Sequence, residues 1–132
     1  MAAVADVIRV LIVDDDPLVR VGLSLVLSAS DDIEVVGEAS DGAQAIEATG
    51  RLKPDLVLMD IRMSGMDGLS AAEALQASES PTAVVVITTF DTDEHILRAL
   101  RAGAVGFLLK DTPPLEIIES VRRVAAGESM LS

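Results

Sequence analysis

Five short apolar runs alternate with segments of helical spacing along the chain. The runs lie at 7–13, 33–36, 56–59, 83–87 and 105–109. Most are continuously hydrophobic, which is typical of strands buried on both faces of a parallel sheet. The expected helices cover 17–29, 42–52, 68 to the stretch before Pro81, 93–102, and 113 to a stop at Gly127. This alternation predicts right-handed parallel crossovers and a three-layer α/β sandwich.

The apolar positions also predict which side of each helix packs on the sheet. These positions are Leu18, Val21, Leu25 and Ala29 in the first helix, Ala45, Ile46 and Thr49 in the second, Leu69, Ala72 and Leu75 in the third, and Leu115, Ile118, Val121 and Val124 or Ala125 in the fifth. Nothing in the sequence marks a linker, a repeat or a low-complexity tract. One domain spanning residues 1–132 is therefore expected.

Composition narrows the classes of function. Half of the 132 residues are apolar, enough for one domain to bury a core. The chain has no cysteine, which excludes disulfides, zinc thiolate sites and thiol catalysis. A net charge of −12 repels a phosphate backbone, and two phenylalanines without Trp or Tyr give little surface for base stacking. Direct nucleic-acid binding is not expected.

The location of the protein is also predicted from the sequence. No stretch has the form of a signal peptide, and no apolar run is long enough to span a membrane. We expect a cytoplasmic domain.

Aspartates follow two of the apolar runs. Asp14, Asp15 and Asp16 come directly after 7–13, and Asp60 comes directly after 56–59. We expect a flavodoxin-like sheet of strand order 2-1-3-4-5, in which sites form at the carboxyl ends of strands 1 and 3, where the strand order reverses. Carboxylates about 4 Å apart repel by roughly 4 kcal/mol at an effective dielectric near 20, so the cluster needs a cation. Mg²⁺ suits such a site, because it prefers oxygen ligands and is often held by carboxylates together with phosphate.

The last two apolar runs also end in polar residues. Thr88 and Thr89 follow Ile87, and Lys110 follows Leu109. A carboxylate can accept a phosphoryl group as an acyl phosphate, and the transfer needs charge neutralisation and in-line positioning. A magnesium ion, an ammonium and a hydroxyl would supply both. The strand ends together predict a phosphoryl-transfer site.

Five motifs in order resemble those of a bacterial two-component response-regulator receiver domain, over essentially the whole chain. They are Leu11-Ile12-Val13-Asp14-Asp15, Val57-Leu58-Met59-Asp60, Gly65-Met66-Asp67-Gly68, Ile87-Thr88-Thr89 and Gly106-Phe107-Leu108-Leu109-Lys110-Asp111. The chain is most similar to the branch whose receivers precede a LuxR/NarL-type helix-turn-helix. One departure from that branch is Asp16, which stands where histidine is common.

The resemblance implies a role for each acid. Asp60 would accept phosphate from a sensor histidine kinase. Asp14 and Asp15 would hold Mg²⁺, with Mn²⁺ as an alternative ion, together with Asp60 and the backbone carbonyl of Arg62.

The resemblance also implies how the phosphate would switch the domain. Thr88 would bind a phosphoryl oxygen, Lys110 would pair with the same group, and Phe107 matches an aromatic switch position. Phosphorylation would then control dimerisation, for which the first and fifth helices offer apolar faces. It would thereby control transcription through a C-terminal DNA-binding domain absent from this chain. The implied protein is a phosphorylated regulator and not a conventional multiple-turnover enzyme.

Other readings of these residues stay open. Asp14-Asp15-Asp16 also fits the Asp-x-Asp motif of a haloacid-dehalogenase-type phosphatase, with Asp14 as its nucleophile. A receiver-like module that dimerises without phosphorylation is a third possibility. Asp16 is expected to cap the first helix beside Pro17. Thr89 is expected to be an ordinary strand residue.

Overall fold

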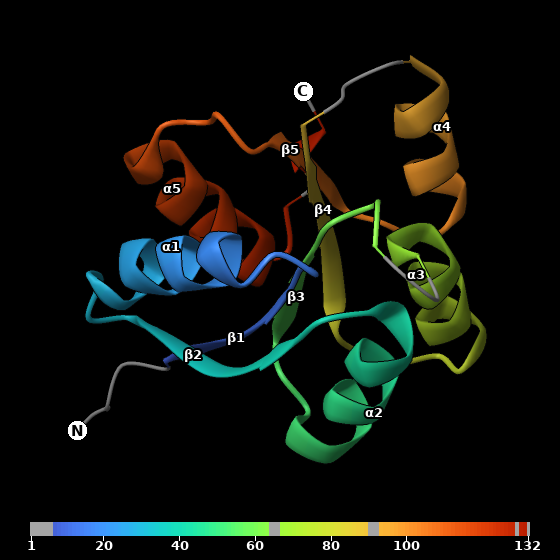
Figure 1. The fold of residues 1–132 in the computed structure, drawn as a ribbon, viewed down its shortest axis with the longest axis horizontal. Helices are drawn as coiled ribbons and strands as arrows, with labels where there is room; N and C mark the ends of the chain where they lie inside the picture. The colour runs from blue at the N-terminus through green and yellow to red at the C-terminus, as the bar shows by residue number, and fades with distance from the viewer. Residues whose placement is uncertain (1–6, 64–66, 90–92, 129, 132) are drawn as a thin grey trace.

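The computed structural model describes residues 7–63, 67–89, 93–128 and 130–131. Its strands are β1 (Ile8–Val13), β2 (Ile33–Ala39), β3 (Leu56–Met59), β4 (Ala83–Thr88), β5 (Gly106–Leu109) and β6 (Met130–Leu131). They form one sheet of order β2-β1-β3-β4-β5-β6, in which every neighbouring pair is parallel (Figure 1). The predicted order 2-1-3-4-5 is confirmed. The two-residue strand β6, paired with β5, is an addition that the sequence pattern does not predict.

Helices cover both faces of this sheet. They are α1 (Pro17–Ser28), α2 (Gly42–Leu52), α3 (Gly68–Ala77), α4 (Asp93–Arg101) and α5 (Pro114–Ala125). Helices α1 and α5 lie on one face, and α2, α3 and α4 lie on the other (Figure 1). The three-layer α/β sandwich is therefore confirmed. No helix in the described part of the chain has the length and hydropathy needed to cross a membrane.

The sheet separates two apolar cores. Along β1, Leu11 and Val13 belong to the core beneath α2, α3 and α4, while Val10 and Ile12 belong to the core beneath α1 and α5. Alternate side chains of a strand point to opposite faces, so a strand covered on both sides must be apolar throughout. This explains why the apolar runs of the sequence are continuous.

The packed face predicted for α1 is wrong. Leu18, Val21 and Leu25 are exposed, and Leu23 and Leu27 are buried instead. The helix is apolar almost all round, so it carries two stripes with helical spacing, and the sheet accepts the stripe that contains Leu23 and Leu27.

The prediction for α5 is wrong at one position. Leu115 is exposed and the neighbouring Ile117 is buried, whereas Ile118, Val121 and Val124 pack as expected. The predicted faces of α2 and α3 agree with the structure, since Ala45, Thr49, Leu69, Ala72 and Leu75 are buried.

Aspartate side chains cap three of the helices. Asp16 accepts a hydrogen bond from the backbone N–H of Leu18, Asp41 from Gln44 and Asp67 from Ser70. Each cap satisfies a backbone donor that the first helical turn leaves unpaired. The predicted role of Asp16 as a helix cap is confirmed.

Candidate functional site

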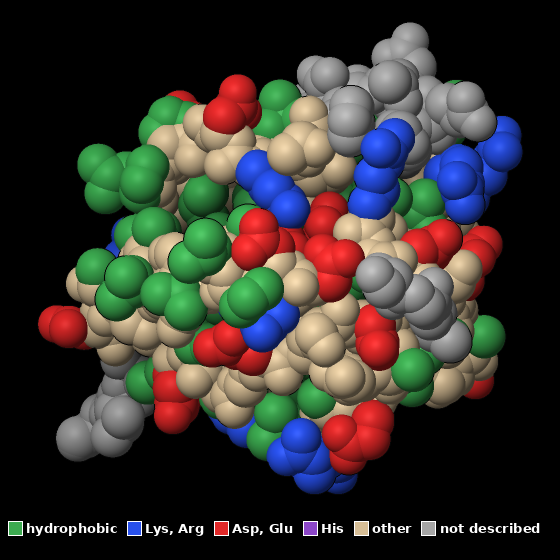
Figure 2. All heavy atoms as spheres, in the orientation of Figure 1, with side chains coloured by type: hydrophobic (Ala, Val, Ile, Leu, Met, Phe, Trp, Pro, Cys, Tyr) green, Lys and Arg blue, Asp and Glu red, His purple; other side chains and the backbone are tan. Residues whose placement is uncertain are grey.

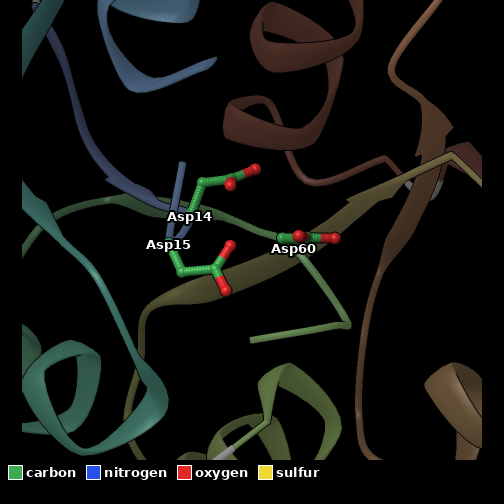
Figure 3. A group of neighbouring side chains, drawn as sticks. All are labelled: Asp14, Asp15 and Asp60. Carbon is green, nitrogen blue, oxygen red and sulfur yellow. The ribbon is translucent and has the colours of Figure 1, made fainter. Parts of the chain in front are cut away.

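Three carboxylates meet at the carboxyl ends of β1 and β3. Val13 pairs with Met59 in the parallel register, so Asp14 and Asp60 leave the sheet at the same level. The backbone N–H of Asp60 donates to the carbonyl of Val13 at 3.0 Å, which extends this pairing past the strand ends. Ligand oxygens of Asp14, Asp15 and Asp60 lie within 4.8 Å of one another. Figure 3 shows the side chains of Asp14 and Asp15 extending from β1 toward the side where Asp60 lies.

The donor set fits a divalent cation. Asp14 is 1% exposed and Asp60 is 5% exposed, while Asp15 faces solvent. Oδ1 of Asp14 accepts a hydrogen bond from the backbone N–H of Asp16 at 2.9 Å. Oδ2 of Asp14 is buried and receives no well-directed hydrogen bond from the described residues. A buried oxygen of this kind, beside two more carboxylates, is a suitable ligand for Mg²⁺.

Lys110 brings a positive charge to the same cluster. It directly follows β5, and its backbone N–H donates to the carbonyl of Thr88 at 2.8 Å. Its Nζ donates a hydrogen bond of 3.2 Å to Oδ2 of Asp60. The same Nζ lies 2.7 Å from Oδ2 of Asp14, an ionic contact that is close but poorly aligned as a hydrogen bond.

Burial and charge act against each other on these groups. Burial raises the pKa of Asp60 and the negative charge of Asp14 adds to the rise, while Lys110 only partly offsets them. For Lys110, burial alone would lower the pKa, but the contact with Asp14 and the charge of Asp60 outweigh it and raise the pKa. The ammonium thus stays charged and compensates for two buried carboxyl groups.

Close backbone contacts hold the start of α3 against Asp60 and Ile61. The backbone N–H of Gly68, at the start of α3, donates to the carbonyl of Ile61 at 3.0 Å. A Cβ at position 68 would lie 2.0 Å from the carbonyl oxygen of Asp60, so only glycine allows this approach. The backbone N–H of Arg62 lies 3.4 Å from Oδ1 of Asp60, a long hydrogen bond. The expected metal contact through the carbonyl of Arg62 stays a prediction.

The two predicted switch residues lie on neighbouring strands. Thr88 ends β4, beside β3, and is buried. Phe107 lies in β5, pairs in register with Val86 and is buried in the core beneath α2, α3 and α4. Thr89, expected to be an ordinary strand residue, instead lies directly after the end of β4 and is exposed. Thr88 and Lys110 therefore lie at the carboxyl ends of the strands, as the acids do, and Phe107 lies within the core.

Arg20 also contacts this site, although it is not among the residues predicted from the sequence. Nη1 of Arg20 donates a hydrogen bond of 2.6 Å to the carbonyl oxygen of Asp14. Arg20 is the only charged residue in α1, and that isolation in an otherwise apolar and neutral helix is a signal that could have singled it out. On the face of the molecule that Figure 2 shows, acidic (red) and basic (blue) side chains lie side by side in the middle.

Comparison with known proteins gives consistent matches. The sequence profile of the response regulator receiver domain matches residues 10–122. The chain is 46% identical over 125 residues to the uncharacterized transcriptional regulatory protein YxjL of Bacillus subtilis, covering 95% of this chain and 57% of the relative. It is 41% identical over 123 residues to the nitrate/nitrite response regulator protein NarL of Escherichia coli K12, and the match covers 93% of this chain and 57% of NarL. The chain therefore spans little more than half the length of these curated relatives.

A solved structure agrees with these matches. A signal receiver domain from Mycobacterium tuberculosis superimposes with a TM-score of 0.91 at 44% sequence identity, covering 93% of this chain and 99% of that one. These matches do not favour the alternative of a haloacid-dehalogenase-type phosphatase. The chain belongs to the response regulator receiver domain family.

Proposed function

We propose that Asp60 is a phosphoacceptor whose modification switches this domain. The main support for the proposal is that three carboxylates after two adjacent strands lie close together, and Nζ of Lys110 contacts two of them. In the reaction, a carboxylate oxygen of Asp60 attacks the phosphorus of a phosphohistidine on a sensor kinase. The P–O bond forms, the P–N bond breaks, and the leaving imidazole takes up a proton. The product is an acyl phosphate.

The other site residues serve this transfer by neutralising and orienting charge. Asp14, Asp15 and Asp60, with the carbonyl of Arg62, would hold Mg²⁺ or Mn²⁺, and the bound ion would neutralise the transferred phosphoryl group. Lys110 already lies 3.2 Å from Oδ2 of Asp60 and would pair with a phosphoryl oxygen.

Two residues would then transmit the effect of phosphorylation from the site into the domain. Thr88, at the end of the adjacent strand, would donate its hydroxyl to another phosphoryl oxygen. Phe107, buried in β5, would move with it.

The longer relatives suggest what the switch controls. YxjL is named a transcriptional regulatory protein and NarL a response regulator protein, and this chain spans 57% of the length of each. We infer that the domain acts through an attached DNA-binding domain and does not bind nucleic acid itself, since its net charge is −12. Under this proposal the protein works in the cytoplasm, as a regulator rather than a multiple-turnover enzyme.

Phosphorylation would act by changing self-association. Leu18, Val21 and Leu25 on α1 and Leu115 on α5 are exposed. Figure 2 shows apolar side chains gathered on the left of the molecule, where Figure 1 places α1 and α5. An apolar surface of this kind suits contact with a second copy. Sedimentation velocity with interference detection, needed because the chain lacks Trp and Tyr, would measure the shift to dimer after phosphorylation.

Intact-mass measurement tests the proposal directly. Incubation with Mg²⁺ and a small phosphodonor is expected to add one phosphate to the wild type and none to Asp60→Asn. An adduct that persists in Asp60→Asn would contradict the proposal, and so would a wild type that takes up no phosphate. Repeated release of phosphate from small phosphoesters, lost in Asp14→Asn but kept in Asp60→Asn, would indicate the phosphatase instead.

A further inference from the structure

Arg20 connects α1 to the end of β1 and to β2. Its Nη1 donates a hydrogen bond of 2.6 Å to the carbonyl oxygen of Asp14, and its Nε donates to Oε1 of Glu38 at 3.0 Å. The Arg20 side chain is 19% exposed. Because the side chain is mostly buried and its guanidinium donates both hydrogen bonds, it is held in one conformation.

The carbonyl that Arg20 contacts belongs to the peptide bond between Asp14 and Asp15. The same segment is held at two other points, by the backbone N–H of Asp14 on the carbonyl of Ala39 at 3.1 Å and by the N–H of Asp16 on Oδ1 of Asp14 at 2.9 Å. Those two bonds fix the ends of the segment. The bond from Arg20 fixes the direction of the peptide plane between the two acids, and this direction sets where the Asp15 side chain leaves the backbone.

We propose that Arg20 is a positioning residue that holds Asp14 and Asp15 in the arrangement that binds the metal ion. The inference rests on the proposed function, because it takes these acids as the Mg²⁺ ligands of the phosphorylation site. Groups that orient metal ligands typically change metal affinity about 10-fold to 100-fold when they are removed. Arg20 has this relationship to the two acids through the backbone carbonyl that lies between them.

The contact with Glu38 makes it possible to distinguish two ways in which Arg20 could affect Mg²⁺ binding, by positioning the acids or by its charge. Because Glu38 pairs with Arg20, the two side chains together add no net charge near the acids. If charge were the main effect, Arg20→Met would remove a positive group and would strengthen Mg²⁺ binding, and Glu38→Gln would weaken it. If positioning is the main effect, Arg20→Met weakens Mg²⁺ binding. Glu38→Gln then leaves it near the wild-type value, because Gln still offers an oxygen to Nε.

The experiment compares Arg20→Met with Arg51→Met in the same chain. Arg51 forms a similar ion pair with Glu47 at 3.1 Å, but it lies on α2 and is exposed. Calorimetric titration with Mg²⁺ is expected to show a loss of about tenfold or more in affinity for Arg20→Met and no change for Arg51→Met. Hydrogen exchange of metal-free protein is expected to be faster at the amides of residues 14–16 in Arg20→Met alone.

A second substitution keeps the test informative. Arg20→Lys keeps the positive charge but loses the planar fork that reaches Asp14 and Glu38 together. It is expected to bind Mg²⁺ more weakly than the wild type and more tightly than Arg20→Met. If Arg20→Met does not fold, Arg20→Lys with wild-type affinity and wild-type exchange would overturn the inference.

Failure of the inference can be told from failure of the proposed function. Arg20→Met with unchanged or stronger Mg²⁺ affinity overturns the role of Arg20, whether or not Asp60 accepts phosphate. A wild type that binds no Mg²⁺ and takes up no phosphate overturns the proposed function. In that case the exchange comparison at residues 14–16 still decides whether Arg20 positions the segment, since it needs no metal.

Discussion

Nζ of Lys110 donates a hydrogen bond of 3.2 Å to Oδ2 of Asp60, so a residue after β5 contacts the carboxylate after β3 across the end of β4. The same Nζ lies 2.7 Å from Oδ2 of Asp14. One ammonium thus contacts both buried carboxylates of the cluster. A bound divalent cation would use the same carboxylate oxygens as this ammonium. Lys110 therefore stabilises the acids in the absence of metal and competes with the cation for them.

Lys110→Met should destabilise the metal-free protein. Removing one partner of a partly buried ion pair leaves two carboxylates without their cation, and we expect a loss of about 1–3 kcal/mol in the free energy of unfolding. Added Mg²⁺ should then stabilise the variant more than the wild type. Urea denaturation followed by circular dichroism, with and without Mg²⁺, measures both effects. Lys53→Met, at an exposed position, is the control and should change neither value.

Gly68→Ala should disturb Asp60 through the backbone. The added Cβ would lie 2.0 Å from the carbonyl oxygen of Asp60, and a backbone atom cannot yield as a flexible side chain can. We expect a loss of about 1–3 kcal/mol in stability and slower uptake of phosphate. Gly50→Ala, where nothing lies within 4 Å of the new Cβ, should stabilise α2 by about 0.5–1 kcal/mol. Equal effects of the two substitutions would contradict the close approach at Gly68.

The order of strands and the place of the site were predictable for one physical reason. Buried parallel strands must be apolar on both faces, so their limits are visible in the sequence, and the residues after them gather at one edge of the sheet. That is why Asp14, Asp60 and Lys110, far apart along the chain, were expected together and are found together.

Other features depend on tertiary contacts that no local pattern contains. Helix α1 has two apolar stripes, and spacing could not decide that Leu27 faces the sheet while Leu25 faces outward. Strand β6 is only two residues long, and its conformation follows from pairing with the edge of β5. The isolated charge of Arg20 in α1 is visible in the sequence, but its acceptor is the backbone carbonyl of Asp14, which the residue types cannot indicate.

Substitution of Leu27 should cost far more stability than substitution of Leu25, although both lie in the same helix. Leu27 is fully buried, so Leu27→Ala should lower the free energy of unfolding by about 2–5 kcal/mol. Leu25 is 69% exposed, so Leu25→Gln should change stability by less than about 0.5 kcal/mol. Urea denaturation measures both. A large loss in Leu25→Gln would mean that the stripe predicted from the sequence packs on the sheet after all.

Acid should weaken the contact between α5 and the segment before β2. Hydrogen bonds from Arg122 and Ser30 lower the pKa of Asp32 to about 2. Because the folded-state pKa lies below the unfolded value near 4, the stabilisation is complete above about pH 4 and is lost as the pH falls toward 2.

Arg122→Met removes the ion pair with Asp32, together with a longer contact of 3.8 Å to the exposed Glu119. The difference in melting temperature between the wild type and Arg122→Met should be constant above about pH 5 and should shrink between pH 4 and pH 2. Taking the difference cancels the opposite contribution of Asp60, whose raised pKa favours the folded state at low pH. A difference that stays constant down to pH 2 would mean that the Asp32–Arg122 pair makes no pH-dependent contribution.

Thr88→Val should separate acceptance of phosphate from the response to it. Thr88 is buried at the end of β4, and valine fills a similar volume without a hydroxyl. Under the proposed function, the variant should still gain phosphate on Asp60 by intact mass, because the nucleophile and the acids are unchanged. Its shift to dimer in sedimentation velocity should be reduced, because one hydrogen bond to the phosphoryl group is missing. Thr88→Ser should restore the shift, and Thr89→Val, at the exposed neighbour, should leave it unchanged. If Thr88→Val dimerises as fully as the wild type at equal phosphorylation, the hydroxyl has no part in the switch.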